Sequence, residues 1–262
     1  MNGYGGENGY DNGNGGQWGE MSAAQKALKD CGSSAWFFAA AAGYTASSVI
    51  YAFTNLGPGA WLFGKDYHTL FQSVNLVMTL MSMVQLVVFV LICVGMWMFF
   101  AGCKGARPVS AGSLTAVKVG ICINLILGVV SCLFSAGVMI WILVETGHAG
   151  RHLAQGRAAL LGMVIGMLIL TVLLIVYYGK ALKCAGAAQE ICREGWPKKK
   201  LPVSLAVMNF ILAGFIALGL LGLSTQEDPG RLYLAGQICQ LLSLICVSVC
   251  ILKLRERLIL GN

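Results

Sequence analysis

Six long stretches of the chain consist almost entirely of apolar residues and carry charges only at their ends. Each is at least about 20 residues long, the length that an α-helix needs to cross the hydrocarbon core of a bilayer. Apolar and polar positions do not alternate within them, so the pattern predicts helices rather than the strands of a membrane barrel. The stretches are residues 33–55, 70–101, 117–144, 158–179, 201–224 and 232–252. We therefore expect an all-α, polytopic integral membrane protein, a bundle of six transmembrane helices.

The segments that flank these stretches predict three smaller units. Residues 1–20 contain eight Gly and four Asn without an apolar run, which is typical of a disordered tail. Residues 21–32 should form an interfacial amphipathic helix, because Ser22 and Gln25 have the spacing of a capping box at its start. Residues 253–262 are interpreted as a short basic tail.

A second amphipathic helix is expected after the fourth apolar stretch. Small and apolar residues recur there at helical spacing, and Gly195 and Pro197 provide a stop signal. The apolar side of this expected helix consists of Leu182, Ala185, Ala188 and Cys192.

Composition agrees with a membrane setting. Hydrophobic residues make up 57% of the 262 positions and charged residues 11%, whereas soluble domains carry about 25% charged residues. The polar side chains are too few to cover a globule of this size, so a water-soluble fold and disorder of the whole chain are both excluded.

The basic residues are distributed unevenly between the two sides of the predicted membrane. The first, third and fifth connections between spans hold only Lys65, Arg151, Arg157 and Arg231 of the 18 basic residues. The other 14 lie in or next to the two tails and the second and fourth connections. By the positive-inside rule, both termini should be cytoplasmic in a cell membrane. The net charge of +7 is then explained by topology and by contact with membrane lipid, and we expect no nucleic-acid partner.

Neutral polar residues interrupt the apolar spans. The residues that matter most are Asn75, Gln85, Asn124, Asn209, Gln237 and Gln240. Such groups are costly against lipid, so they should face protein, a cavity or a ligand path. They admit two interpretations, namely hydrogen bonds between helices, worth about 1 kcal/mol each, or the lining of a transport path. Counted from the span ends, Asn124 and Asn209 should lie at similar depth toward the cytoplasm, and Asn75, Gln237 and Gln240 toward the outside.

Small residues at helical spacing predict close helix packing. Gly162 and Gly166 form a G-x-x-x-G pattern in the fourth span, and Ala39, Gly43 and Ser47 share one face of the first. Such faces let helices approach closely. The neighbour can be another helix of this chain, a membrane protein partner or a second copy in a homo-oligomer.

Residues suited to catalysis are missing from the span interiors, which contain no Asp, Glu or His. We therefore expect no enzyme and assign no catalytic, cofactor-binding or metal-binding residue. Glu145, His148 and His152 form one grouping with ligand-like spacing outside the spans. We interpret it as a solvated loop rather than a zinc site, because Gly147 and Gly150 weaken a helix there.

Two functional hypotheses remain. The first is a non-catalytic structural, accessory or partner-binding membrane component, which the lack of ionisable groups within the spans favours. The alternative is a transport protein, either a permease subunit or a passive conduit for a neutral solute, in which the neutral polar residues line the path.

Overall fold

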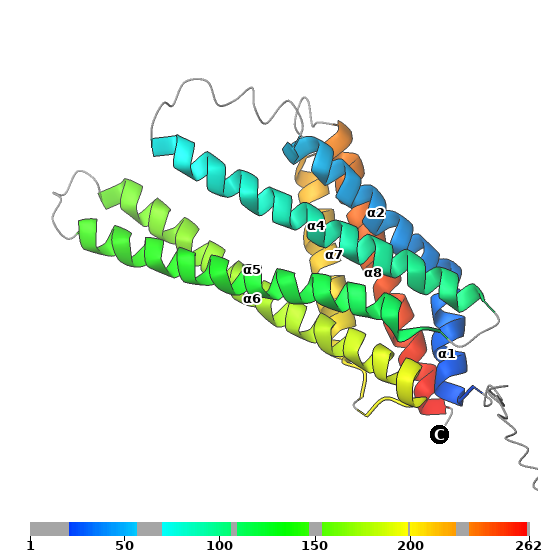
Figure 1. The fold of residues 1–262 in the computed structure, drawn as a ribbon. Coiled ribbons are helices and arrows are strands. Elements are labelled where there is room, and N and C mark those ends of the chain that lie inside the picture. Colours follow the sequence, from blue (N-terminus) through cyan, green and yellow to red (C-terminus); the bar gives the residue numbers. More distant parts are fainter. Residues whose placement is uncertain are drawn as a thin grey trace, which may run out of the picture.

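The fold was examined in a computed structural model that describes residues 21–56, 70–105, 109–146, 154–198, 200–223 and 231–260. Within these ranges the regular structure is entirely helical (Figure 1). The helices are α1 (Ala23–Gly32), α2 (Ala35–Leu56), α4 (Leu70–Lys104), α5 (Ala111–Thr146), α6 (Ala154–Glu194), α7 (Val203–Leu223) and α8 (Arg231–Leu260). The predicted all-α class is therefore confirmed.

Six of these helices are long and apolar enough to cross a membrane, namely α2, α4, α5, α6, α7 and α8. Each coincides with one of the six predicted spans, although α2 begins two residues after the predicted start and α7 covers only Val203–Leu223 of the predicted range 201–224. Large apolar side chains lie on their outer surfaces, as for Phe134, which is 73% exposed, and Phe53, which is 71% exposed. Apolar patches of this kind indicate an environment other than water. Insertion into a membrane and the cytoplasmic position of the termini remain predictions.

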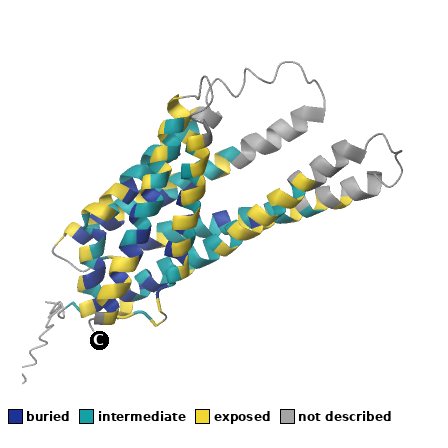
Figure 2. Ribbon diagram, turned by 180° about the vertical axis from the view of Figure 1, so that it is seen from behind, coloured by how far each residue is buried: buried dark blue, intermediate teal, exposed yellow. Residues whose placement is uncertain are grey.

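The six long helices form a ring. Each packs against the helix that precedes it and the helix that follows it in the chain, and α8 packs against α2 to close the circle. The contact between α6 and α7 is the smallest of the six. Figures 1 and 2 show the α5–α6 pair leaving the other helices toward the end of the molecule that lies away from the C-terminus.

Glycines allow the closest approaches within the ring. A Cβ added at Gly43 of α2 would lie 2.8 Å from the backbone carbonyl oxygen of Cys239 in α8. A Cβ added at Gly120 of α5 would lie 2.6 Å from the Ile92 side chain of α4. The prediction that Gly43 lies on a packing face is thus confirmed, with α8 as its neighbour. By contrast, a Cβ at Gly162 or Gly166 would meet nothing within 4 Å.

Several helices are longer than the hydropathy pattern predicts, α6 and α8 most of all. The segment expected as a separate amphipathic helix after residue 179 is the last part of α6, a single helix of 41 residues. It ends at Gly195, whose φ of 80° lies in the left-handed region that favours glycine. At the other end of the chain, α8 continues to Leu260 through most of the segment interpreted as a tail.

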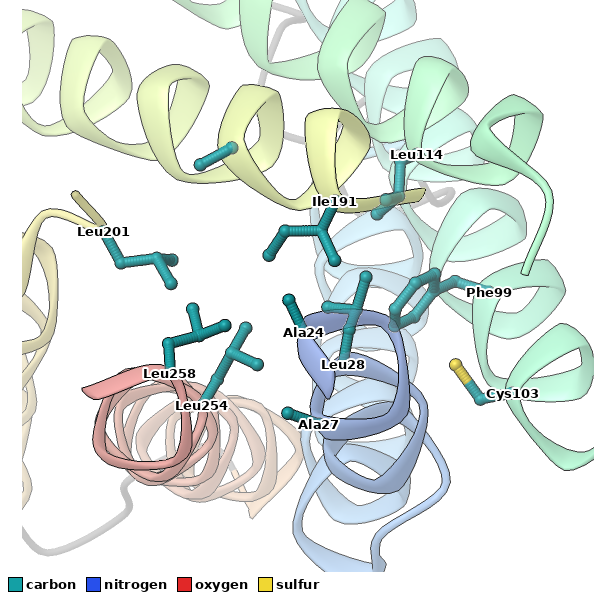
Figure 3. Close-up of a cluster of buried hydrophobic side chains, with 11 residues drawn as sticks. Ala24, Ala27, Leu28, Phe99, Cys103, Leu114, Ile191, Leu201, Leu254 and Leu258 are labelled. Carbon is teal, nitrogen blue, oxygen red and sulfur yellow. The ribbon is translucent and has the colours of Figure 1, made fainter. Parts of the chain in front are cut away.

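Helix α1 lies across one end of the ring. Its capping box is present as predicted, with the Ser22 hydroxyl accepting from the Gln25 backbone N–H and the Gln25 side chain accepting from the Ser22 N–H. Its apolar face packs into what we call the basal cluster (Figure 3). This cluster consists of Ala24, Ala27, Leu28, Phe99, Cys103, Leu114, Ala187, Ile191, Leu201, Leu254 and Leu258. It joins α1 to α4, α5, α6 and α8 at the end of the ring nearest the C-terminus.

Some predictions fall outside the described residues. The tail over residues 1–20 is one, and the grouping of His148 and His152 is another. Glu145 and Asn75 lie in helices whose backbone is described, but their side chains are not.

Substitution of Gly43 by Val should destabilise the ring, because the new side chain would be forced against the α8 backbone. Overpacking of this kind costs about 1–3 kcal/mol, so we expect thermal unfolding in detergent several degrees below that of the wild type. Gly214→Val is the matched control, since a Cβ at Gly214 meets nothing within 4 Å. Equal unfolding temperatures for the two variants would contradict the close α2–α8 contact.

Candidate functional site

The ring of helices surrounds a central cavity with a volume of about 1380 Å³. Side chains from all six long helices line it, and Leu28, Cys31 and Gly32 of α1 lie at one end. This volume exceeds the roughly 300–1,000 Å³ of ordinary small-molecule pockets. The cavity is therefore large enough for a ligand bigger than a typical metabolite.

The described part of the cavity lining is uncharged. It includes no Asp, Glu, Lys, Arg or His, and most of its side chains are apolar. The polar lining residues are Tyr44, Ser47, Ser48, Tyr51, Ser82, Gln85, Asn124, Ser131, Thr171, Tyr177, Tyr178, Asn209, Tyr233, Gln237, Gln240 and Ser243. Five of the six neutral polar residues singled out from the sequence are among them, and Asn75 lies outside the described side chains. Their predicted inward orientation is thus confirmed for these five.

Gln85 and Asn124 lie at the same level on neighbouring helices. The antiparallel register of α4 and α5 follows from the contacts of Gly120 with Ile92 and of Gly95 with Val117. Continued for one turn, this register places Asn124 opposite residues 84–88 of α4, a range that includes Gln85. Two neutral amide side chains from adjacent helices therefore border the same part of the cavity.

Gln237 and Gln240 occupy a neighbouring level on α8. The Ser243 hydroxyl donates a hydrogen bond of 2.9 Å to the Ala40 carbonyl oxygen, and Gly236 packs on Ile50. This register sets Gln237 and Gln240 opposite the segment of α2 that carries Tyr44, Ser47 and Ser48. We call Gln85, Asn124, Gln237 and Gln240 the polar belt, because together they border the cavity from three helices, α4, α5 and α8.

Asn209 lies nearer the basal cluster than the polar belt does. The Ser248 hydroxyl bonds to the Ala206 carbonyl oxygen at 3.4 Å, so Asn209 of α7 lies opposite about residue 245 of α8. That position is about 8 Å along the helix axis from Gln240. The contacts place Asn124 level with Gln85, and the expectation that Asn124 and Asn209 share one depth toward the cytoplasm stays a prediction.

The Asn209 side chain is fully buried, and both its amide nitrogen and its amide oxygen lack a hydrogen-bond partner. A buried polar group without a partner costs about 1–3 kcal/mol. The other buried amide side chain of this half, Gln189, is satisfied by Thr115 at 2.8 Å and by Lys118 at 3.5 Å. Asn209 therefore lacks the hydrogen bonds to a neighbouring helix that a polar side chain retained for helix packing would make.

The basal cluster closes the cavity at the α1 end. Leu28, Leu201 and Leu254 line the cavity there and are each at most 5% exposed. Polar contacts also attach α1 to the rest of the chain. The Ser22 hydroxyl donates a hydrogen bond to the Gly195 carbonyl oxygen, and the Gln25 side-chain amide donates one to the Cys192 carbonyl oxygen. Arg257 forms an ion pair with Asp30.

Sequence reasoning missed the contribution of α1 to this cavity. Its amphipathic pattern was visible, but a membrane surface is the usual partner of such a helix. The residues that bury it instead, such as Ile191, Leu254 and Leu258, lie more than 150 positions away in the chain. Local periodicity contains no signal for a contact of that kind.

Neither a metal site nor a disulfide is indicated in the part of the chain that the structure describes. No group of three or more His, Cys, Asp or Glu side chains is placed to hold a metal ion there. All ten cysteines are free. No family model, curated protein or solved structure matches the chain.

Burial, rather than the ion pair, should hold α1 in place. Leu28 is 4% exposed, and truncating such a residue to Ala costs about 2–5 kcal/mol. The side chains of Asp30 and Arg257 are 63% and 52% exposed, and exposed pairs are worth at most about 1 kcal/mol. We expect Leu28→Ala to lower the thermal unfolding temperature in detergent clearly, whereas Asp30→Asn leaves it nearly unchanged. The reverse order would show that charge attaches α1.

Proposed function

We propose that the protein is a non-catalytic, multi-pass membrane protein that binds a neutral ligand in its central cavity and thereby serves transport of that ligand. The observation that carries this proposal is the gathering of five neutral polar residues, drawn from α4, α5, α7 and α8, around one cavity. Polar groups used only to join helices would be paired with one another and would not border a common space.

Asn209 supports a ligand more directly. Its buried amide has one acceptor and two donor hydrogens without partners. A hydroxyl, ester or amide of a bound molecule can satisfy these groups and remove the free-energy penalty. The polar belt offers further amides about 8 Å or more away along the cavity. A ligand with neutral polar groups at one or two points matches this arrangement.

The uncharged lining supports both the absence of catalysis and the neutrality of the ligand. Acid–base and nucleophilic catalysis need ionisable side chains at the reacting atoms, and the lining supplies none beyond phenols and thiols. A charged ligand would lose its hydration without gaining an opposite charge, which is strongly unfavourable.

We further propose that both termini are on the cytoplasmic side of the cell membrane. The basic residues support this orientation through the positive-inside rule. The connection between α6 and α7 is one of the basic segments, and there Glu194 contacts Lys198 at 2.9 Å and raises the pKa of the lysine. The remaining basic groups near the helix ends are suited to contact anionic lipid headgroups.

A partner-binding role is the second candidate function. Gly162 and Gly166 are exposed on α6, and neither has a neighbour that an added Cβ would meet within 4 Å. Such a face accommodates a close helix from another membrane protein or from a second copy of this chain. These glycines are not among the residues that line the cavity.

Asn209→Leu should separate ligand binding from packing. We expect the wild-type protein, purified in mild detergent, to retain a neutral compound that mass spectrometry detects after denaturation. The variant should retain at least about tenfold less, because the hydrogen bonds to the ligand are lost. Its unfolding temperature, measured after the bound compound has been removed from both proteins, should equal or exceed that of the wild type, since Leu leaves no unpaired polar atom.

Ser248→Ala is the matched control. Ser248 is as fully buried as Asn209 and lies close by on α8, but it does not line the cavity. This variant should retain the compound. The proposal fails if no neutral compound accompanies the wild-type protein and Asn209→Leu lowers the unfolding temperature, because Asn209 would then be a packing residue.

The topology is tested with epitope tags on the two ends. We expect antibodies to reach both tags only after the cells have been permeabilised, because an even number of spans places both ends on one side. A tag inserted between residues 224 and 231, in the connection after the fifth span, should be reached in intact cells. Labelling of either terminal tag in intact cells would contradict the orientation.

A further inference from the structure

The seam between α6 and α7 is closed over one half of its length. Near the basal cluster, Tyr177, Ala181 and Cys184 of α6 pack against Leu205 and Ala206 of α7. Ile251 of α8 belongs to the same cluster and is 7% exposed. The two helices thus form a continuous wall of the cavity at this level.

The other half of the seam is open. On α6, Gly166, Leu170 and Leu173 continue the helical stripe of Tyr177, yet Leu170 is 54% exposed and Leu173 is 53% exposed. On α7, Phe215 lines the cavity and is 67% exposed at the same time. Together with the small contact between the two helices, these exposed side chains indicate that the seam is open at this level.

Gly219 lies at the same opening. It lines the cavity one turn beyond Phe215, and a Cβ added there would meet nothing within 4 Å. The opposite side of α7 is covered, since Ala206 and Ala213 are at most 4% exposed and Ala206 accepts the Ser248 hydrogen bond from α8. Helical geometry therefore directs Phe215 and Gly219 away from α8 and toward the α6 side.

This opening faces sideways rather than along the helix axes. It is bordered by residues 166–173 in the first part of the α6 span and by residues 215–219 in the last part of the α7 span, within the segments that are apolar enough to cross a membrane. In the proposed topology these segments are surrounded by lipid, so a molecule passing between them comes from the hydrocarbon and not from water.

The dimensions of the cavity specify the ligand further. Along α8 the lining extends from Tyr233 to Leu254, which is about 30 Å at 1.5 Å per residue and matches the thickness of the hydrocarbon core. The space is long, mostly apolar and uncharged, with amides at intermediate depth. A long hydrocarbon chain attached to a small neutral polar group fits these features.

We propose that the ligand is an uncharged long-chain lipid that enters the cavity sideways from the bilayer through the open half of the α6–α7 seam. This inference rests on the proposed function and names its substrate class. Hydrocarbon chains fill the apolar length of the cavity, and hydroxyl or ester groups reach Asn209 or the polar belt. The uncharged lining discriminates against lipids with a phosphate headgroup.

The test uses the full chain in liposomes that contain a trace of diacylglycerol with a photoreactive diazirine on one acyl chain. Illumination should label peptides of α6, α7 and α8 that line the cavity, and excess unlabelled diacylglycerol should compete. A phosphatidylglycerol probe with the same acyl chain should label these peptides at least fivefold less. Equal labelling by the two probes would overturn the discrimination against charge.

Gly219→Trp tests the route, because Gly219 lies at the opening and a Cβ added there meets nothing within 4 Å. It should lower diacylglycerol labelling of the lining at least fivefold. The matched control is Gly214→Trp on the same helix, where an added side chain also meets nothing within 4 Å but does not line the cavity. Gly166→Trp fills the seam from α6 and replaces Gly219→Trp if that variant fails to fold.

Two results separate this inference from the proposed function. If a neutral compound accompanies the wild-type protein and depends on Asn209, but diacylglycerol does not label the lining, the lipid class is wrong and ligand binding stands. If diacylglycerol labels the lining equally in wild-type and folded Gly219→Trp and Gly166→Trp proteins, the sideways route is wrong.

Discussion

The basal cluster is the contact on which the rest of the architecture depends. It joins α1, α4, α5, α6 and α8 around Leu28 and Ile191 at one end of the ring. At the other end the α5–α6 pair leaves the remaining helices. Interiors of proteins are normally packed without large voids. A ring of long helices fixed tightly at one end and splayed at the other leaves such a void, and the central cavity is the result.

The placement of polar groups follows from the same geometry. In a tightly packed bundle, an amide on one helix would find its partner on the next helix. Here Gln85 and Asn124 face a space instead, and Asn209 is buried without a partner. The lost hydrogen bonds lower the stability of the empty protein, and a ligand that restores them gains a corresponding amount of binding free energy.

Much of the fold could be predicted from the sequence, because span length and backbone hydrogen bonding in lipid allow few alternatives. The sequence correctly predicted the six long helices, the capping box at Ser22 and the inward orientation of the polar residues. It did not predict the length of α8, because hydropathy alone cannot show where a helix ends once it continues beyond its apolar stretch. The continuity of α6 was missed for a related reason, since the polar residues after residue 179 contain no helix breaker before Gly195. The cavity itself depends on gaps between helices, which periodicity along one helix does not encode.

The closed end also decides between two kinds of transport. A passive conduit needs an opening at both ends, whereas Leu28, Leu201 and Leu254 fill the space beneath the cavity and are almost fully buried. Each buried leucine contributes about 1.5–3 kcal/mol. If displacing α1 costs about 4 kcal/mol, only about one molecule in 1,000 is open at that end at any moment. The architecture therefore favours a protein that holds its ligand over one that lets a solute flow freely, and passage to the α1 side requires the basal cluster to separate.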